Sequence, residues 1–209
     1  MKLPLRMSKL SEAKTLGGIG SILMLLVIVP SAGWVLALVG AILSLFAVKY
    51  VSDAVAEPAI FRNMLIAIIL AVVGLFVGVA VIAAAVLGAV GLGALGQNFP
   101  GSMPPMVVTG DFVRLIVGAI AGLAVVWVLL IVSAYFVRKS YSTMGARLGV
   151  GIFGTTGLLY LIGAALTIIL VGFIIIFVAL ILNIIAFWSI PDQAPMAHSS
   201  APSPAPTTT

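Results

Sequence analysis

Four long apolar stretches, separated by short polar segments, constrain the fold of this 209-residue chain more than any other feature. They cover residues 16–48, 64–95, 112–137 and 148–190. The hydrocarbon core of a bilayer is about 30 Å thick, so about 20 apolar residues cross it as a helix. Those residues must be helical because lipid offers no hydrogen-bond partner to the backbone. The pattern therefore predicts an all-α, polytopic transmembrane helical bundle.

The composition also indicates lipid rather than water as the main solvent. Hydrophobic residues make up 63% of the chain and charged residues 7%, whereas soluble domains carry roughly 25% charged residues. The lysines and arginines lie between the apolar stretches, so we expect no nucleic-acid partner, which would need a clustered basic patch. Membrane lipids are the expected surroundings, and the expected location is multi-pass in the cell membrane.

Two of the stretches are predicted to fold back as hairpins. Pro30, Ser31 and Gly33 interrupt the first stretch, and proline and glycine are typical where a helix stops and the chain reverses. The last stretch would be about 64 Å long as one helix, so we expect it to divide between Leu166 and Gly172. The result is about six spans arranged as three helical hairpins.

The basic residues predict the orientation of these spans. Of the 10 lysines and arginines, only Arg114 falls on the side of the outer loop, residues 97–111. Loops rich in lysine and arginine stay in the cytoplasm, so both termini are predicted to be cytoplasmic. The residues on that side are Lys2, Arg6, Lys9, Lys14, Lys49, Arg62, Arg138, Lys139 and Arg147.

The chain divides into three segments. Residues 1–15 are a basic cytoplasmic segment, residues 16–190 a single transmembrane domain, and residues 191–209 a tail rich in Pro, Ala, Ser and Thr that is predicted to be disordered. The first and last hairpins match weakly at an offset of 139 residues, which pairs Gly18 with Gly157 and Gly33 with Gly172. Glycine is common in this chain, so duplication and coincidence both remain open.

The apolar stretches lack the ionisable side chains that catalysis, a metal or a proton relay would need within a membrane. Cysteine is absent, His198 lies in the tail, and the five acidic residues fall at helix ends or in loops. Two Gly-x-Gly-x-x-Gly matches begin at Gly91 and Gly149, but neither lies in the βαβ unit that dinucleotide binding requires. We therefore expect no enzymatic activity, no cofactor and no metal.

Asn183 is the most polar residue within a predicted span, and hydroxyl residues accompany it on several of the spans. Such side chains form hydrogen bonds between helices, and they could equally contact a solute. The hydroxyl residues are Ser21, Ser44, Ser133, Thr155, Thr156, Tyr160 and Thr167.

Two glycine pairs have the small-xxx-small spacing of close helix contacts. Gly74 with Gly78, and Gly118 with Gly122, predict packing between the third and fourth helices or between two copies of the chain.

Several residues mark the predicted ends of spans. Pro58 is expected to start the third helix, and Asp111 to cap the fourth. Aromatic residues near span ends are expected to anchor the helices at the membrane interface. These aromatic residues are Trp34, Tyr50, Tyr141 and Trp188.

Three blocks of sequence carry a resemblance to a known family. They are residues 10–20 (LSEAKTLGGIG), residues 47–54 (AVKYVSDA) with 60–62 (IFR), and residues 185–191 (IAFWSIP). The chain, except for its tail, resembles an archaeal family of membrane proteins known as domain of unknown function family 996. The resemblance implies an archaeal cell-membrane protein and brings no activity with it.

Two functions fit this sequence. The first is a non-enzymatic structural or accessory subunit that assembles, with itself or with another membrane protein, through its glycine-rich helix faces. The alternative is a small channel or permease for an uncharged or weakly polar solute, with Asn183 and the hydroxyl groups along its path.

Overall fold

Six long helices and two 3₁₀ turns make up the part of the chain that the structure describes. A computed structural model describes residues 3–90 and 109–191, and it has no β-strand within those ranges. The 3₁₀ turns are η1 (Leu26–Ile28) and η2 (Thr167–Ile169). The helices are α1 (Leu3–Leu25), α2 (Gly33–Ala54), α3 (Pro58–Val90), α5 (Thr109–Leu148), α6 (Gly151–Leu166) and α7 (Val171–Trp188).

The prediction of an all-α fold with six helices long and apolar enough to cross a membrane is confirmed. Pro58 starts α3 as expected. Two boundaries differ from expectation. Helix α1 begins at Leu3, so Lys9 and Lys14 belong to it, and α5 begins at Thr109, so Asp111 lies within its first turn instead of capping it. The predicted tail and most of the predicted outer loop, residues 97–108, lie outside the described residues.

Both predicted reversals occur, and each has a glycine in the first turn of its second helix: Gly33 is the first residue of α2 and Gly172 the second residue of α7. A Cβ atom on Gly33 would collide with the carbonyl oxygens of η1, and a Cβ atom on Gly172 would collide with the backbone at the start of η2. Each second helix can therefore fold closely against the turn that precedes it. The 139-residue offset pairs these two glycines, so the two hairpins share the construction of their turns.

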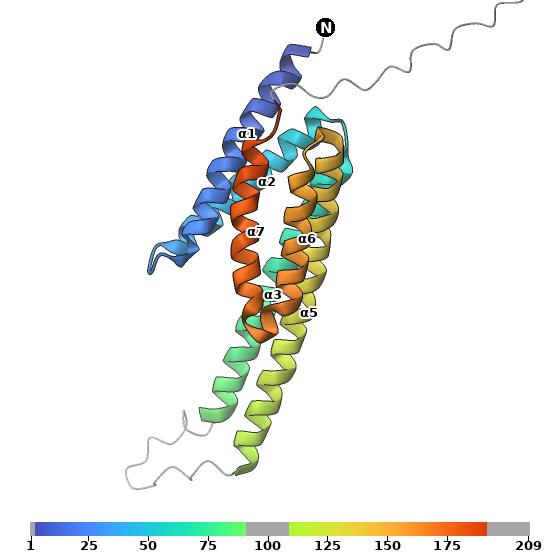
Figure 1. The fold of residues 1–209 in the computed structure, drawn as a ribbon. Helices are drawn as coiled ribbons and strands as arrows, with labels where there is room; N and C mark the ends of the chain where they lie inside the picture. The colour runs from blue at the N-terminus through green and yellow to red at the C-terminus, as the bar shows by residue number, and fades with distance from the viewer. Residues whose placement is uncertain (1–2, 91–108, 192–209) are drawn as a thin grey trace, which may run out of the picture.

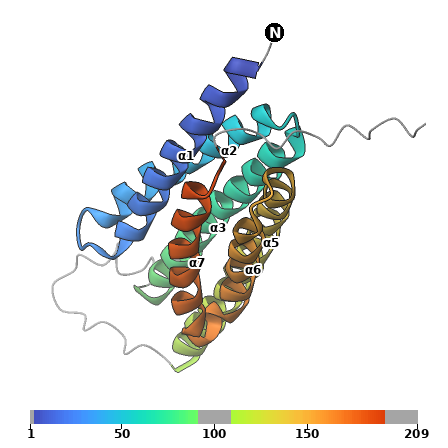
Figure 2. The same cartoon turned by 45° about the horizontal axis from the view of Figure 1, so that its top comes forward.

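The six helices form a ring in which the first and last helices meet. Helix α1 packs along α2 and α7, α7 along α6, α6 along α5, α5 along α3, and α3 contacts α2. Both views show α7 lying between α1 and α6 (Figures 1 and 2). The α2–α3 and α5–α6 turns share one end of the ring with the N-terminus of α1 (Figure 1).

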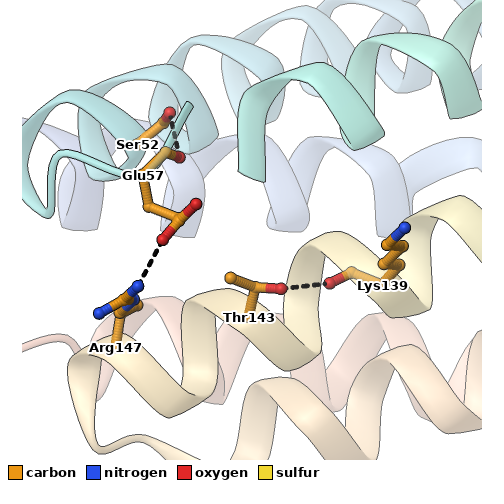
Figure 3. A network of polar contacts seen from close by, with 5 residues as sticks. All are labelled: Ser52, Glu57, Lys139, Thr143 and Arg147. Carbon is orange, nitrogen blue, oxygen red and sulfur yellow. Dashed lines mark hydrogen bonds and ion pairs between the residues drawn. The ribbon is translucent and has the colours of Figure 1, made fainter. Parts of the chain in front are cut away.

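The buried core and the ion pairs of the described residues gather at this shared end, which we call the basic end. Phe153 and Phe187 pack edge to face in the core, with ring centroids 5.2 Å apart. Glu57 of the α2–α3 turn forms an ion pair with Arg147 of α5, and its carbonyl oxygen accepts a hydrogen bond from Ser52 Oγ at 2.9 Å (Figure 3). Exposed ion pairs contribute only about 0–1 kcal/mol, so this pair mainly positions the turn.

Glycine ends helix α5. Gly149 has a φ of +71°, and the Val150 N–H donates to the Gly145 carbonyl at 3.0 Å, which is the Schellman arrangement of a helix C-terminus. The Gly-x-Gly-x-x-Gly match that begins at Gly149 is therefore part of a helix end. The match that begins at Gly91 lies outside the described residues.

The close approach of α1 and α2 leads to a prediction. A Cβ atom on Gly20 would lie 2.7 Å from the Gly40 carbonyl oxygen, whereas a Cβ atom on Gly154 meets nothing within 4 Å. Gly20→Ala should lower the free energy of unfolding by about 1–3 kcal/mol, because the two backbones must separate. Gly154→Ala, the matched control, should leave it unchanged or raise it by up to about 1 kcal/mol. Thermal unfolding in detergent measures both, and equal midpoints for the two variants would contradict the packing.

Candidate functional site

A pocket of about 530 Å³ lies inside the ring of helices, next to the buried core. Its volume falls within the range of about 300–1,000 Å³ that is usual for small-molecule sites. Most of its wall is apolar and comes from facing stripes of α2 and α3, and α1, α5 and α6 complete it. The α2 and α3 stripes consist of Leu38, Ala41, Ile42, Ser44 and Leu45, and of Met64, Ala67, Ile68, Ala71, Val72 and Leu75.

Two serines that line the pocket donate their hydroxyl hydrogens to neighbouring groups of the protein. Ser133 Oγ donates to the Ala67 carbonyl at 2.8 Å, which links α5 to α3. Ser44 Oγ lies 3.8 Å from the sulfur of Met24, a weak acceptor. These hydroxyls therefore contribute mainly to helix packing.

Two tyrosines on the α5 and α6 side of the pocket supply its other polar atoms. The rings of Tyr141 and Tyr160 meet edge to face with centroids 6.4 Å apart. The Tyr160 hydroxyl has no hydrogen-bond partner among the described residues, and the Tyr141 hydroxyl lies close to the Asn183 side chain. Of the two tyrosines in this otherwise apolar wall, Tyr160 is therefore the one whose hydroxyl has no partner among the described residues.

Asn183 forms a hydrogen bond between the last helix and the first, next to the pocket but outside its lining. It is 1% exposed, and its Nδ2 donates to Ser21 Oγ at 2.8 Å. Ser21 Oγ in turn donates to the Gly17 carbonyl at 2.7 Å. The Asn183 carbonyl oxygen has no hydrogen-bond partner. Asn183 is therefore an interhelical contact between α7 and α1, outside the lining of the pocket.

The polar residues singled out from the sequence divide among different roles. Tyr160 lines the pocket. Thr156 donates to the Ile152 carbonyl of its own helix at 2.9 Å, and Thr155 is exposed on the outside of α6. Of Asn183, Thr155, Thr156 and Tyr160, only Tyr160 therefore lines the pocket, where Ser44 and Ser133 join it.

The glycine faces lie mostly within the chain. Gly74 and Gly78 of α3 face Leu129 and Val126 of α5, and Gly122 of α5 is closed over by Val81 of α3. A Cβ atom on Gly118 would meet nothing within 4 Å. Three of the four glycines thus support the contact between α3 and α5.

The expectation for Tyr141 as an interfacial anchor is wrong, because its side chain is only 3% exposed and packs in the core. Trp34 and Trp188 lie near helix ends and are largely exposed, as anchors would be. The signal for Tyr141 was its spacing: Ser133, Val137 and Tyr141 recur every four residues and so share one face of α5.

The described residues contain no cluster of His, Cys, Asp or Glu that could hold a metal ion. Glu12, Asp53 and Glu57 are the acidic residues whose side chains the structure describes, and they do not line the pocket. What the site can offer to a guest molecule is apolar contact and the Tyr160 hydroxyl.

This fold, with six apolar helices of spanning length around a central pocket, is the one expected of a multi-pass α-helical membrane protein. Residues 36–181 match the model of the family described as Protein of unknown function (DUF996), and the chain belongs to this family. It is also similar to an uncharacterized protein, MJ1644, of Methanocaldococcus jannaschii, with 32% identity over 191 residues that cover 88% of this chain and 95% of that one. No solved structure matches the chain.

The hydrogen bond between Ser21 of α1 and Asn183 of α7 leads to a prediction: removing one side chain should cost more stability than removing the other. Ser21→Ala leaves the Asn183 amide buried without a partner, which should cost about 1–3 kcal/mol of unfolding free energy. Asn183→Leu removes that amide and leaves Ser21 bonded to Gly17, so it should cost about 1 kcal/mol or less. The double variant should resemble Asn183→Leu. Chemical unfolding in mixed micelles measures all three, and a larger cost for Asn183→Leu than for Ser21→Ala would contradict this account.

Proposed function

We propose that this protein is a non-enzymatic, multi-pass membrane protein that binds a largely apolar, uncharged or weakly polar molecule in its central pocket. The observation that carries the proposal is the pocket of about 530 Å³, whose lining contains no carboxylate, amine, guanidinium or imidazole. Such a lining favours an uncharged guest, because a charged group would lose its hydration in the pocket without gaining a partner of opposite charge.

Entry from the lipid, between α2 and α3, is the route that the arrangement supports. Helix α2 packs along α1, whereas its contact with α3 is less extensive. The α1–α2 hairpin and the α3–α5 pair diverge from the basic end (Figure 1). The longest stripes of the pocket wall come from α2 and α3, the two helices that diverge.

The Tyr160 hydroxyl gives the site its selectivity. An O–H donor without a partner in an apolar environment costs free energy, so a guest with one acceptor oxygen gains by reaching Tyr160. This proposal follows the permease alternative of the sequence, with Tyr160 in the place that the sequence suggested for Asn183.

An accessory-subunit function is the second proposal, and the open face at Gly118 favours it. Gly74, Gly78 and Gly122 are occupied within the chain, so a second copy or another membrane protein would need a different small residue for close approach. The outer surface of α5 around Gly118 offers one.

The orientation belongs to the same proposal and can be tested in a chain without cysteine. We place both termini in the cytoplasm, because the exposed cations of the described residues gather at the basic end. Ser102→Cys, between α3 and α5, should then react with an impermeant maleimide added to intact cells. Ser11→Cys, which is exposed on α1, should react only after permeabilisation. The reverse pattern would invert the orientation.

Filling the pocket tests the binding proposal. Ala71→Phe places a ring in the pocket wall, whereas Ala80→Phe makes the same change at an exposed position of α3 outside the lining. After mild extraction, mass spectrometry of the purified protein should find a small hydrophobic molecule bound to the wild type and to Ala80→Phe. At least tenfold less should remain on Ala71→Phe.

Equal amounts of the molecule on both variants would reject the pocket as the site. A stoichiometric protein partner, recovered with both variants and in the absence of any small molecule, would support the accessory function instead.

A further inference from the structure

The pocket stripe of α2 ends in a cation. Leu38, Ile42 and Leu45 line the pocket, and Lys49 follows Leu45 by four residues on the same face of the helix. The Lys49 ammonium lies 5.9 Å from the centre of the Phe61 ring on α3. Lys49 is exposed and has no carboxylate partner among the described residues. The pocket between α2 and α3 therefore ends at a positive charge that no acid neutralises.

Further cations lie at the same height along the bundle. Ser140 donates to the Ile60 carbonyl and Ser133 to the Ala67 carbonyl, each at 2.8 Å. This antiparallel register places Arg62 of α3 level with Arg138 of α5. Both arginines are exposed and have no ion-pair partner among the described residues. Exposed cations at one height along the bundle mark the surface of the membrane, because charged side chains are costly within the hydrocarbon.

The pocket lies just beneath this level. Its α3 wall runs from Met64 to Leu75, which places it about 3–20 Å along the helix from Arg62. The pocket therefore occupies the depth of one leaflet, whose lipid head groups lie beside Lys49.

We propose that the pocket binds a membrane lipid with a phosphate head group. The lipid places a hydrocarbon chain between the stripes of α2 and α3 and its phosphate on Lys49. This inference rests on the proposed binding function of the pocket and adds the class of the guest. The charge at the end of the stripe is the observation that favours an anionic head over a neutral one.

Photolabelling in nanodiscs of zwitterionic lipid tests the assignment. One probe is a phosphatidic acid with a diazirine midway along one chain, and the other is a diacylglycerol with the same chains. The phosphatidic acid probe should label pocket residues such as Met64 and Ile68. Lys49→Gln should lower that labelling about fivefold, the effect of losing about 1 kcal/mol for one cation at a membrane surface, and Lys49→Arg should retain it.

Lys139→Gln is the matched control, because Lys139 is exposed on the side of α5 opposite Val137 and Tyr141. It should leave labelling by the phosphatidic acid probe unchanged, and labelling by diacylglycerol should not respond to Lys49→Gln. Pocket labelling by phosphatidic acid that is equal in wild type and Lys49→Gln would reject the phosphate assignment and leave the binding function intact. Absence of pocket labelling by both probes would reject both.

A separate observation concerns the depth of the α6–α7 hairpin. Trp127 Nε1 donates to the Ala165 carbonyl at 3.2 Å, so the end of α6 lies beside Trp127 of α5. Arg114 and Arg138 lie on α5, 13 residues before and 11 residues after Trp127. These separations correspond to about 20 Å and 17 Å along the helix. The segment between the two arginines matches the thickness of a bilayer, and the turn of the hairpin lies at its middle.

We infer that the α6–α7 hairpin enters the membrane from the basic end and turns back at the midplane, whereas α3 and α5 cross completely. Placing the whole of α6 within the hydrocarbon would bring exposed Arg138, which lies beside Gly157 of α6, into the apolar layer as well. The sequence had suggested that both helices of this hairpin cross the membrane, as two of about six spans. The register of α6 against α5 argues for a turn inside the bilayer.

Cysteine labelling distinguishes these two depths. Ile169→Cys, at an exposed position of the turn, should resist an impermeant maleimide added to either face of the membrane and react with a lipid-soluble one. Ser102→Cys and Ser11→Cys provide the reactive controls for the two faces. Reaction of Ile169→Cys with the impermeant reagent from the Ser102 side would show a complete crossing and reject the inference.

Discussion

Close approach of helix backbones at glycine is the interaction on which the rest of this structure depends. Lipid supplies no hydrophobic force between helices, so van der Waals packing and a few hydrogen bonds must hold them together. Gly20 and Gly40 bring α1 against α2, and Gly163 and Gly172 bring α6 against α7. Gly17 makes room for the Phe187 ring, which seats α7 on α1. Each contact fails if a Cβ atom is added, which explains why glycine recurs at these crossings.

The pocket lies where the packing between helices is least extensive, between α2 and α3. Paired helices pack closely within each hairpin, and the large buried side chains, among them Met144, Phe153 and Phe187, gather at the basic end. Helices α2 and α3 meet at that end and diverge beyond it (Figure 1). The space between their apolar stripes is the part of the ring that the chain leaves unfilled, and the tyrosines of α5 and α6 form its inner wall.

Some predictions from the sequence were correct because they rest on periodicity and on single residues that stop helices. The reversal at Pro30 to Gly33 and the start of α3 at Pro58 follow from the backbone limits of proline and glycine. The placement of Tyr141 at the interface was wrong, because distance from a span end says nothing about which face of the helix is covered. Thr155 and Thr156 are adjacent in the sequence, yet one is exposed and the other buried.

The helical class, six helices long and apolar enough to cross a membrane, and the end of the bundle at which the cations gather could all be predicted from the sequence. These follow from hydropathy, length and charge, which are local properties of the chain. Which helices are neighbours became known from the three-dimensional structure, and with it that Tyr141 and Tyr160 line one pocket and that Asn183 lies outside its lining. The physical reason is that apolar helices in lipid look alike along the sequence, and only the fit of small residues against particular partners selects one arrangement.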